Sequence, residues 1–139
     1  MNSDPSRELF QNYLQQYQAY GADRAHIPLE QVKTFHLDWL PRWLDRIPCD
    51  AHILDAGCAT GYLLSLLWET GYQNLKGVEL SEQLAKVAKN ALPPNVAIIV
   101  SDIRDFLTQI PEETFDVILF HHVLEHIPRE HTISLLHEF

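Results

Sequence analysis

The stretch that decides the fold is I-L-D-A-G-C-A-T-G-Y, which runs from Ile53 to Tyr62. A short apolar run leads into Asp55, small residues follow at positions 57, 59 and 61, and a leucine-rich segment begins at Tyr62. This order is typical of a buried strand that ends in a tight turn and continues directly into a helix. Small residues in such a turn let the backbone approach a ligand closely, and the helix start presents unpaired N–H groups. The stretch therefore predicts a ligand-binding strand–turn–helix unit.

Strands and helices alternate along the chain after Pro48. Predicted strands cover 52–56, 75–80, 96–101 and 115–120, and predicted helices cover 62–70, 81–91 and 129–139, with a short helical or turn segment at 103–110. This alternation predicts an α/β domain over 49–139, a Rossmann-like doubly wound parallel sheet with strand order 3-2-1-4. Residues 1–48 are expected to form an N-terminal helical extension, with helices at 8–20 and 29–46.

Composition narrows the class of protein. Ten basic and nineteen acidic residues give a net charge of −9, and no Lys/Arg cluster provides the basic face of a nucleic-acid binder. The two cysteines, Cys49 and Cys58, indicate neither a disulfide framework nor a zinc site. We find no signal peptide and no stretch near the ~20 apolar residues that span a bilayer. We therefore expect a cytoplasmic protein that acts on a small molecule and binds no nucleic acid or membrane.

Two ligand classes use a small-residue turn after the first strand, namely dinucleotides and S-adenosylmethionine. The dinucleotide pattern places its third glycine three residues after the second, whereas the small residues here fall at alternate positions and Tyr62 follows them. Asp55 at the strand end would repel a pyrophosphate but suits a ligand that carries an ammonium and a sulfonium. The turn therefore favours S-adenosylmethionine.

Acidic residues also end the next two predicted strands. Glu79 is placed to accept hydrogen bonds from two ribose hydroxyls, a role that both ligand classes use. Asp102 could accept from an adenine amino group while Leu80 and Ile103 flank the ring. Alternatively, Glu79 is a solvated charge at a strand end and Asp102 caps a helix.

Four motifs together resemble the class I S-adenosylmethionine-dependent methyltransferase family. They are D-A-G-C-A-T-G-Y, G-V-E-L-S, S-D-I and F-D-V-I-L-F-H-H-V-L-E-H-I, and the match covers Ile53 to His126. The resemblance implies cofactor contacts at Asp55, Gly57, Cys58, Ala59, Gly61, Glu79, Leu80, Asp102, Ile103 and His121. Ala59 departs from the family pattern, in which glycine is commoner; alanine costs little there if φ is negative, whereas a positive φ would require glycine.

A weaker resemblance points to bacterial methyltransferases of sugar and surface-polysaccharide pathways, through the L-E-H ending and the tyrosine-rich N-terminal segment. It implies that the N-terminal helices form a lid, with Tyr13, Tyr17 or Tyr20 near the cofactor. The same tyrosines would equally form an aromatic stripe that packs the helix onto the domain.

Titratable side chains are densest after the fourth predicted strand, at His121, His122, Glu125 and His126. A histidine with a pKa near neutrality suits removal of a proton from a hydroxyl acceptor, so His121 and His126 are the candidate catalytic bases. If residues 122–126 are helical, three of these side chains share one face, a spacing that could also bind a divalent metal. A structural pairing of Glu125 with His126 is the third alternative, and we assign no metal ligand.

The chain ends in the helix after the fourth predicted strand, whereas the usual methyltransferase sheet has seven strands. Order 3-2-1-4 would leave the fourth strand as an apolar sheet edge. We expect either a fragment of a longer enzyme, which we favour, or a short protein whose homodimer covers this edge. The predicted function is O-methylation of a small hydroxylated acceptor such as a sugar. The alternatives are a non-catalytic cofactor-binding remnant or interaction module and a nicotinamide-dependent oxidoreductase.

Overall fold

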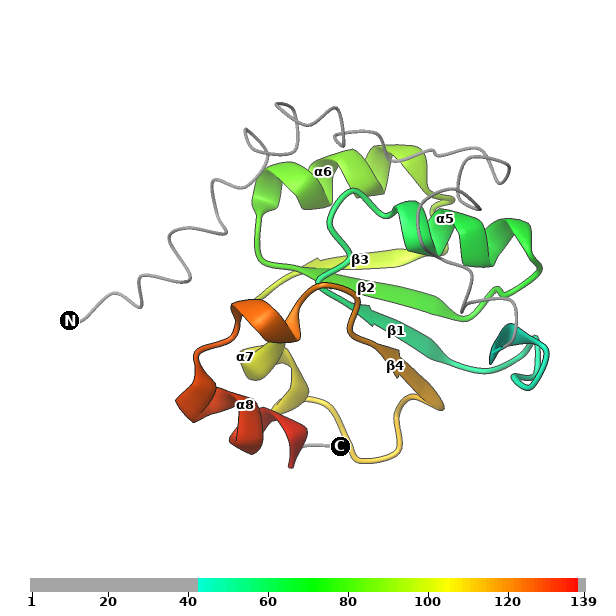
Figure 1. The fold of residues 1–139 in the computed structure, drawn as a ribbon. Helices are drawn as coiled ribbons and strands as arrows, with labels where there is room; N and C mark the ends of the chain where they lie inside the picture. Colours follow the sequence, from blue (N-terminus) through cyan, green and yellow to red (C-terminus); the bar gives the residue numbers. More distant parts are fainter. Residues whose placement is uncertain (1–42, 138–139) are drawn as a thin grey trace.

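A computed structural model describes residues 43–137 of the chain. Its strands form one parallel sheet in the order β3-β2-β1-β4, with β1 at Ile53–Ala56, β2 at Leu75–Glu79, β3 at Ala97–Val100 and β4 at Val117–Leu119. The helices are α5 (Tyr62–Glu69), α6 (Glu82–Ala91), α7 (Ile103–Leu107), the 3₁₀ helix η1 (Leu124–His126) and α8 (Arg129–Leu136). Figure 1 shows α5 and α6 on one face of the sheet and α7 and α8 on the other. The predicted doubly wound fold and strand order are therefore confirmed.

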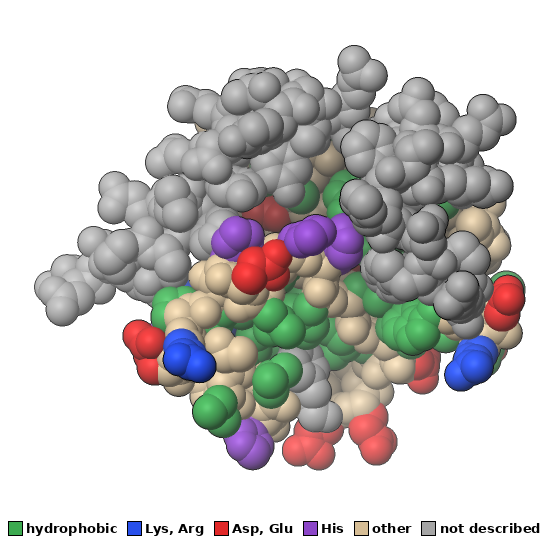
Figure 2. Space-filling view, in the orientation of Figure 1, with side chains coloured by type: hydrophobic (Ala, Val, Ile, Leu, Met, Phe, Trp, Pro, Cys, Tyr) green, Lys and Arg blue, Asp and Glu red, His purple; other side chains and the backbone are tan. Residues whose placement is uncertain are grey.

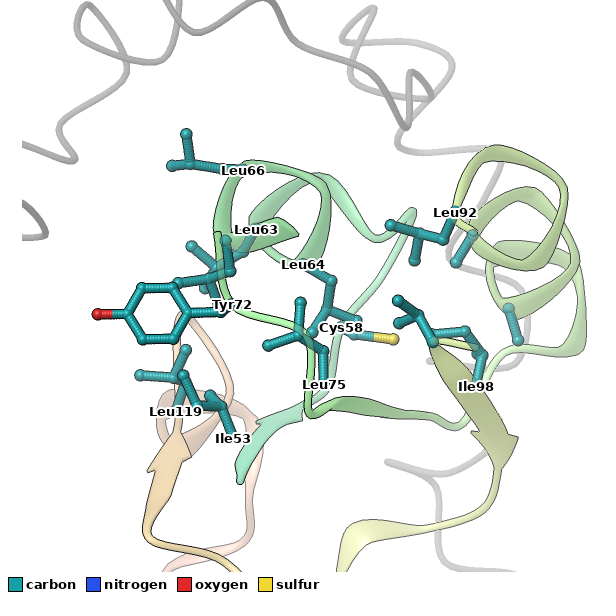
Figure 3. Close-up of a cluster of buried hydrophobic side chains, with 14 of the residues drawn as sticks. Ile53, Cys58, Leu63, Leu64, Leu66, Tyr72, Leu75, Leu92, Ile98 and Leu119 are labelled. Carbon is teal, nitrogen blue, oxygen red and sulfur yellow. The ribbon is translucent and has the colours of Figure 1, made fainter. Parts of the chain in front are cut away.

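The central strand β1 is buried at every position because helices cover both faces of the sheet. Its side chains alternate between two apolar clusters. Ile53 packs with α5 and α6, and Figure 3 shows most residues of this cluster. Leu54 packs with α7 and α8 on the other face. Both side chains have no solvent exposure. The core thus fixes the position of β1, and the small-residue turn follows directly after this strand.

The helices on the first face begin and end for local reasons. Four leucines of α5 are buried, and the helix is followed by Gly71 at φ 106°. The predicted cap of α6 is confirmed, because the Ser81 hydroxyl accepts a hydrogen bond of 3.3 Å from the Leu84 amide. Placed in this way, α5 follows the turn directly and its first residue, Tyr62, lies beside the strand ends.

Several elements are shorter than predicted, and β3 and β4 differ most clearly: β3 covers 97–100 of the predicted 96–101, and β4 covers 117–119 of the predicted 115–120. The segment 103–110, predicted as helix or turn, is helical as far as Leu107 and then forms a turn before Pro111. β4 begins at Val117, where pairing with Ile53 starts; the preceding Asp116 accepts a 2.7 Å hydrogen bond from the His52 amide. These differences lie at element ends, which local interactions decide.

The predictions about the sheet edge, the homodimer and the N-terminal lid concern the ends of the described part of the chain. Within the described sheet β4 is an edge strand, as predicted, and the homodimer that would cover it stays a prediction. The lid with Tyr13, Tyr17 and Tyr20 lies outside the described residues, as does most of the 1–48 extension. No helix between residues 43 and 137 is long and apolar enough to cross a membrane.

Candidate cofactor and acceptor site

The turn after β1 requires unusual backbone angles at alternate residues. φ is +80° at Gly57, +48° at Ala59 and +81° at Gly61, all in the left-handed region that favours glycine. At Gly57 space is also lacking, since a Cβ there would lie 2.5 Å from Val123 Cγ2. The turn is therefore packed directly against the loop that follows β4.

The backbone of Ala59 decides whether alanine is tolerated here without strain. Its φ is positive, so the residue is in the conformation for which glycine was expected. A left-handed conformation costs an L-residue about 1–2 kcal/mol. The amide of Ala59 donates a 2.8 Å hydrogen bond to Glu79 Oε2, which helps to hold alanine in this conformation.

Glu79 supports the turn in a way that the sequence did not predict. Besides the bond to Ala59, its Oε1 accepts a 2.8 Å bond from the Ser81 amide, and the side chain is 8% exposed. Burial raises the pKa of Glu79, while hydrogen bonds from the backbone of Ser81, Ala59 and Leu80 oppose the rise. Each carboxylate oxygen keeps a second lone pair, so the ribose contact predicted for Glu79 is compatible with this geometry and stays a prediction.

Asp55 is the least satisfied polar side chain of the site. It is 2% exposed, and no group within the described part of the chain donates a hydrogen bond to its carboxylate. Burial, with repulsion from Glu79, raises the pKa of Asp55 to about 7. Because buried polar groups are nearly always partnered, this carboxylate fits a ligand that supplies a cationic donor. The ammonium of S-adenosylmethionine is such a donor, so the residues present fit the cofactor.

Asp102 has taken the second of its two predicted roles. Its Oδ1 accepts a 2.9 Å bond from the Arg104 amide and so caps α7. The Arg104 guanidinium also binds both carboxylate oxygens, at 2.9 Å from Nε and 2.7 Å from Nη2. The adenine contact stays a prediction; the pairing with Arg104 was missed, although a basic residue two positions after the cap was a signal for it.

The other residues predicted to contact the cofactor differ in how far they are buried. The Cys58 side chain lies in the core below the turn, and its sulfur comes within 2.6 Å of where Gly77 would carry a Cβ, so the cofactor contact of Cys58 stays a prediction for its backbone (Figure 3). Only the backbone of this residue can face a ligand. Ile103 is buried at the start of α7 and Leu80 is half-buried after β2, so both lie at strand ends where an adenine contact was predicted.

His121 lies in the loop after β4, next to the turn. Its Nδ1 is 2.5 Å from the Tyr62 hydroxyl, and its ring meets that of His122 with the centroids 4.3 Å apart. Burial, followed by the charge of His122, lowers the pKa of His121, while Glu125 opposes this effect. Figure 2 shows histidine side chains gathered beside acidic ones on this face. The contact with Tyr62 was missed, since that tyrosine was considered only for its bulk.

The predicted helical face of residues 122–126 is wrong. His122 has φ +57°, and only Leu124–His126 form a 3₁₀ turn, because a left-handed residue cannot continue a helix. Glu125 Oε1 lies 3.0 Å from His122 Nδ1, a contact that was not predicted, while the pairing of Glu125 with His126 stays a prediction. In residues 43–137 no group of three or more His, Cys, Asp or Glu side chains is placed to hold a metal ion. His126 is exposed on η1, whereas His121 is half-buried beside the turn, and the predicted role of each as a base stays a prediction.

Comparisons with known proteins agree with this geometry. The family described as "Methyltransferase domain" matches residues 54–138. The ubiquinone biosynthesis O-methyltransferase of Neisseria meningitidis is 30% identical over 103 residues, which cover 72% of this chain and 42% of that protein. A SAM-dependent methyltransferase from Archaeoglobus fulgidus has a TM-score of 0.69 at 24% identity, over 91% of this chain and 51% of that one. Magnesium protoporphyrin IX methyltransferase from Synechocystis PCC 6803, solved with bound SAM, also reaches 0.69, at 18% identity over 99% and 72% of the two chains.

A Rossmann-like sheet with an acidic, small-residue turn at its carboxyl edge defines a nucleotide-binding α/β protein. The chain belongs to the class I S-adenosylmethionine-dependent methyltransferase family. It spans less than half the length of the curated relative it matches, 42%.

Proposed function

We propose that this chain binds S-adenosylmethionine at the turn after β1 and serves O-methylation of a small hydroxylated acceptor such as a sugar. The observation that carries the proposal is the Asp55 carboxylate, which is buried beside the turn with no donor in the described structure. When bound, S-adenosylmethionine supplies a methyl group whose bond to sulfur breaks, with its electron pair left on sulfur, as the acceptor oxygen bonds to carbon.

Each side chain around the turn would contact a different part of the cofactor. Asp55 would hold the cationic methionine end and Glu79 the ribose, while Leu80 and Ile103 would flank the adenine. Asp102 already uses both oxygens for Arg104 and α7, so any bond to the adenine amino group would use its remaining lone pairs. All of these residues lie at the carboxyl ends of strands, where open α/β sheets bind their ligands.

His121 is the proposed base. A half-buried imidazole with a lowered pKa is neutral at physiological pH, and can therefore accept the proton that the acceptor hydroxyl loses. Its place after β4 supports this role, because Val123 of the same loop contacts Gly57 of the turn.

A second candidate acceptor comes from the relative in Neisseria meningitidis, whose name assigns it to ubiquinone biosynthesis. O-methylation is common to both candidates, and the acceptor distinguishes them. A panel that contains sugars and phenolic quinone precursors, assayed for transfer of a labelled methyl group, would decide between the two.

Calorimetric titration with S-adenosylhomocysteine tests the cofactor assignment. Asp55→Ala and Glu79→Ala should each weaken binding by about 1–3 kcal/mol through loss of charge-assisted hydrogen bonds. Asp50→Ala is the matched control, because it removes an exposed carboxylate outside the site. Unchanged affinity in both site variants would refute the assignment, and binding of NADH in place of S-adenosylhomocysteine would favour an oxidoreductase. Cofactor binding without transfer to any acceptor would favour the non-catalytic module.

A further inference from the structure

We infer that Glu79 is a positioning residue for the turn after β1, so that its carboxylate shapes the binding surface for the methionine end of the cofactor in addition to contacting the ribose. The inference rests on the proposed function, in which Asp55 and the turn hold the methionine end, and it gives Glu79 a second role there. It comes from a hydrogen bond between the end of β2 and a turn residue that lies 20 positions earlier in the sequence.

The end of β2 holds three consecutive backbone amides of the turn. The Gly57 and Cys58 amides both donate to the Val78 carbonyl, at 2.8 and 2.9 Å. The next amide, that of Ala59, donates to Glu79 Oε2 at 2.8 Å. A backbone N–H can only donate, so the direction of each of these bonds is settled. Two neighbouring residues of β2 therefore fix the course of the turn that follows β1.

Among these three amides, that of Ala59 is held by a side chain, and it belongs to a residue that needs the support. An alanine at φ +48° is strained, and such strain persists only where the surroundings enforce it. Ala59 and Glu79 are only 6% and 8% exposed, so water cannot readily replace the carboxylate. Loss of the Glu79 oxygens would leave a buried amide without its acceptor, in a conformation that alanine disfavours.

The Glu79 carboxylate is itself held at its other oxygen. Oε1 accepts a 2.8 Å bond from the amide of Ser81, the residue that caps α6. A carboxylate anchored at both oxygens keeps one orientation, and each oxygen retains a lone pair for a ribose hydroxyl in the proposed complex. Ribose binding and the shape of the turn then depend on the same group, so the two ends of the cofactor bind cooperatively.

Two ligands separate the turn from the ribose in a test of this inference. S-adenosylhomocysteine and methylthioadenosine share the adenosine, but only S-adenosylhomocysteine has the amino-acid end that the proposed function places at the turn. The ratio of their affinities, measured by calorimetry, therefore reports the methionine end alone. Glu79→Ala should weaken methylthioadenosine about 5- to 10-fold through the ribose, and S-adenosylhomocysteine by a further factor of about 3 to 10, the size of one hydrogen bond.

Ala59→Gly separates the shape of the turn from the charge of Glu79. Glycine adopts a positive φ without strain, so in the Glu79→Ala background it should bring the affinity ratio back to within about twofold of wild type. If the ratio fell only because a charge near the ligand ammonium was lost, glycine would not restore it. Glu82→Ala is the matched control, because it removes an exposed carboxylate from the first turn of α6 and should leave both affinities unchanged.

Hydrogen exchange of the Ala59 amide, followed by NMR without ligand, tests the bond to Glu79 directly. We expect this amide to be protected in wild type and to exchange at least about 10-fold faster in Glu79→Ala. The Ile53 amide, which donates to the Asn74 carbonyl at the other end of β1, is the reference for global opening and should keep its rate relative to the stability of each protein.

An affinity ratio that Glu79→Ala leaves unchanged would overturn the inference, and so would a ratio that falls and is not restored by Ala59→Gly. An Ala59 amide that exchanges freely in wild type would also overturn it, and this result does not require any variant to fold. A wild-type chain that binds neither ligand would refute the proposed cofactor site, and the exchange measurement would then still decide whether Glu79 holds the turn.

Discussion

Asp55→Asn should stabilise this protein at alkaline pH while it weakens cofactor binding. The wild-type carboxylate is buried next to Glu79 and has no hydrogen-bond donor within residues 43–137. Its pKa is about 7 in the folded chain against an ordinary value of 3.8, so the folded state binds more protons than the unfolded state between these values. Stability therefore falls as the pH rises through this window.

The magnitude follows from the two pKa values. The full separation corresponds to about 4 kcal/mol, of which about 3 kcal/mol is lost between pH 5 and pH 8. Asparagine has nearly the same shape as aspartate and does not titrate between pH 5 and pH 8. The stability of the Asp55→Asn variant therefore has no contribution from titration at this position. The difference between variant and wild type should therefore increase by about 3 kcal/mol from pH 5 to pH 8.

Urea denaturation of both proteins at pH 5, 6, 7 and 8 measures the difference directly. Asp50→Asn serves as control, because it removes a carboxylate that is exposed. Parallel stability curves for wild type and Asp55→Asn would refute the reasoning, since Asp55 would then titrate alike in the folded and unfolded chains. An unchanged affinity of Asp55→Asn for S-adenosylhomocysteine would contradict the role of the charge.

Three further predictions concern the same turn. Affinity for S-adenosylhomocysteine should fall by up to tenfold per pH unit below about pH 7, as Asp55 must lose its proton before it can hold an ammonium; calorimetry across pH checks this. Ala59→Gly should raise the free energy of unfolding by about 0.5–1 kcal/mol, because φ is +48°; an unchanged urea midpoint would contradict it. Gly57→Ala should cost about 2–4 kcal/mol through its positive φ and its clash with Val123, and Val123→Ala should restore part of the loss in the double variant.

The order of the fold was readable from the sequence because each element has its own local signal. Apolar runs bounded by turn residues located the strands, and the small-residue turn located the carboxyl edge of the sheet. The ends of elements were less certain, as the late starts of β3 and β4 show. There the outcome depends on single hydrogen bonds, such as that from the His52 amide to Asp116.

The acidic residues at the ends of the strands could be identified from the sequence, but their contacts could not. Asp55 and Glu79 could be identified because they end strands of a parallel sheet, whose carboxyl ends share one edge. That Glu79 binds two backbone amides and that Cys58 points into the core could not be read from their positions. Such facts depend on φ angles and side-chain directions, which residue spacing does not specify.

By itself, then, the sequence determined the class of fold and the acidic residues at the carboxyl edge of the sheet, because these follow from local patterning and from the alternation of strands and helices. Only the tertiary structure decided which partners these residues have. Tyr62 meets His121 and Gly57 meets Val123 because the sheet order places the first and fourth strands side by side. Segments far apart in the chain become neighbours through packing, and it is this packing that leaves Asp55 buried with its charge uncompensated in the described chain.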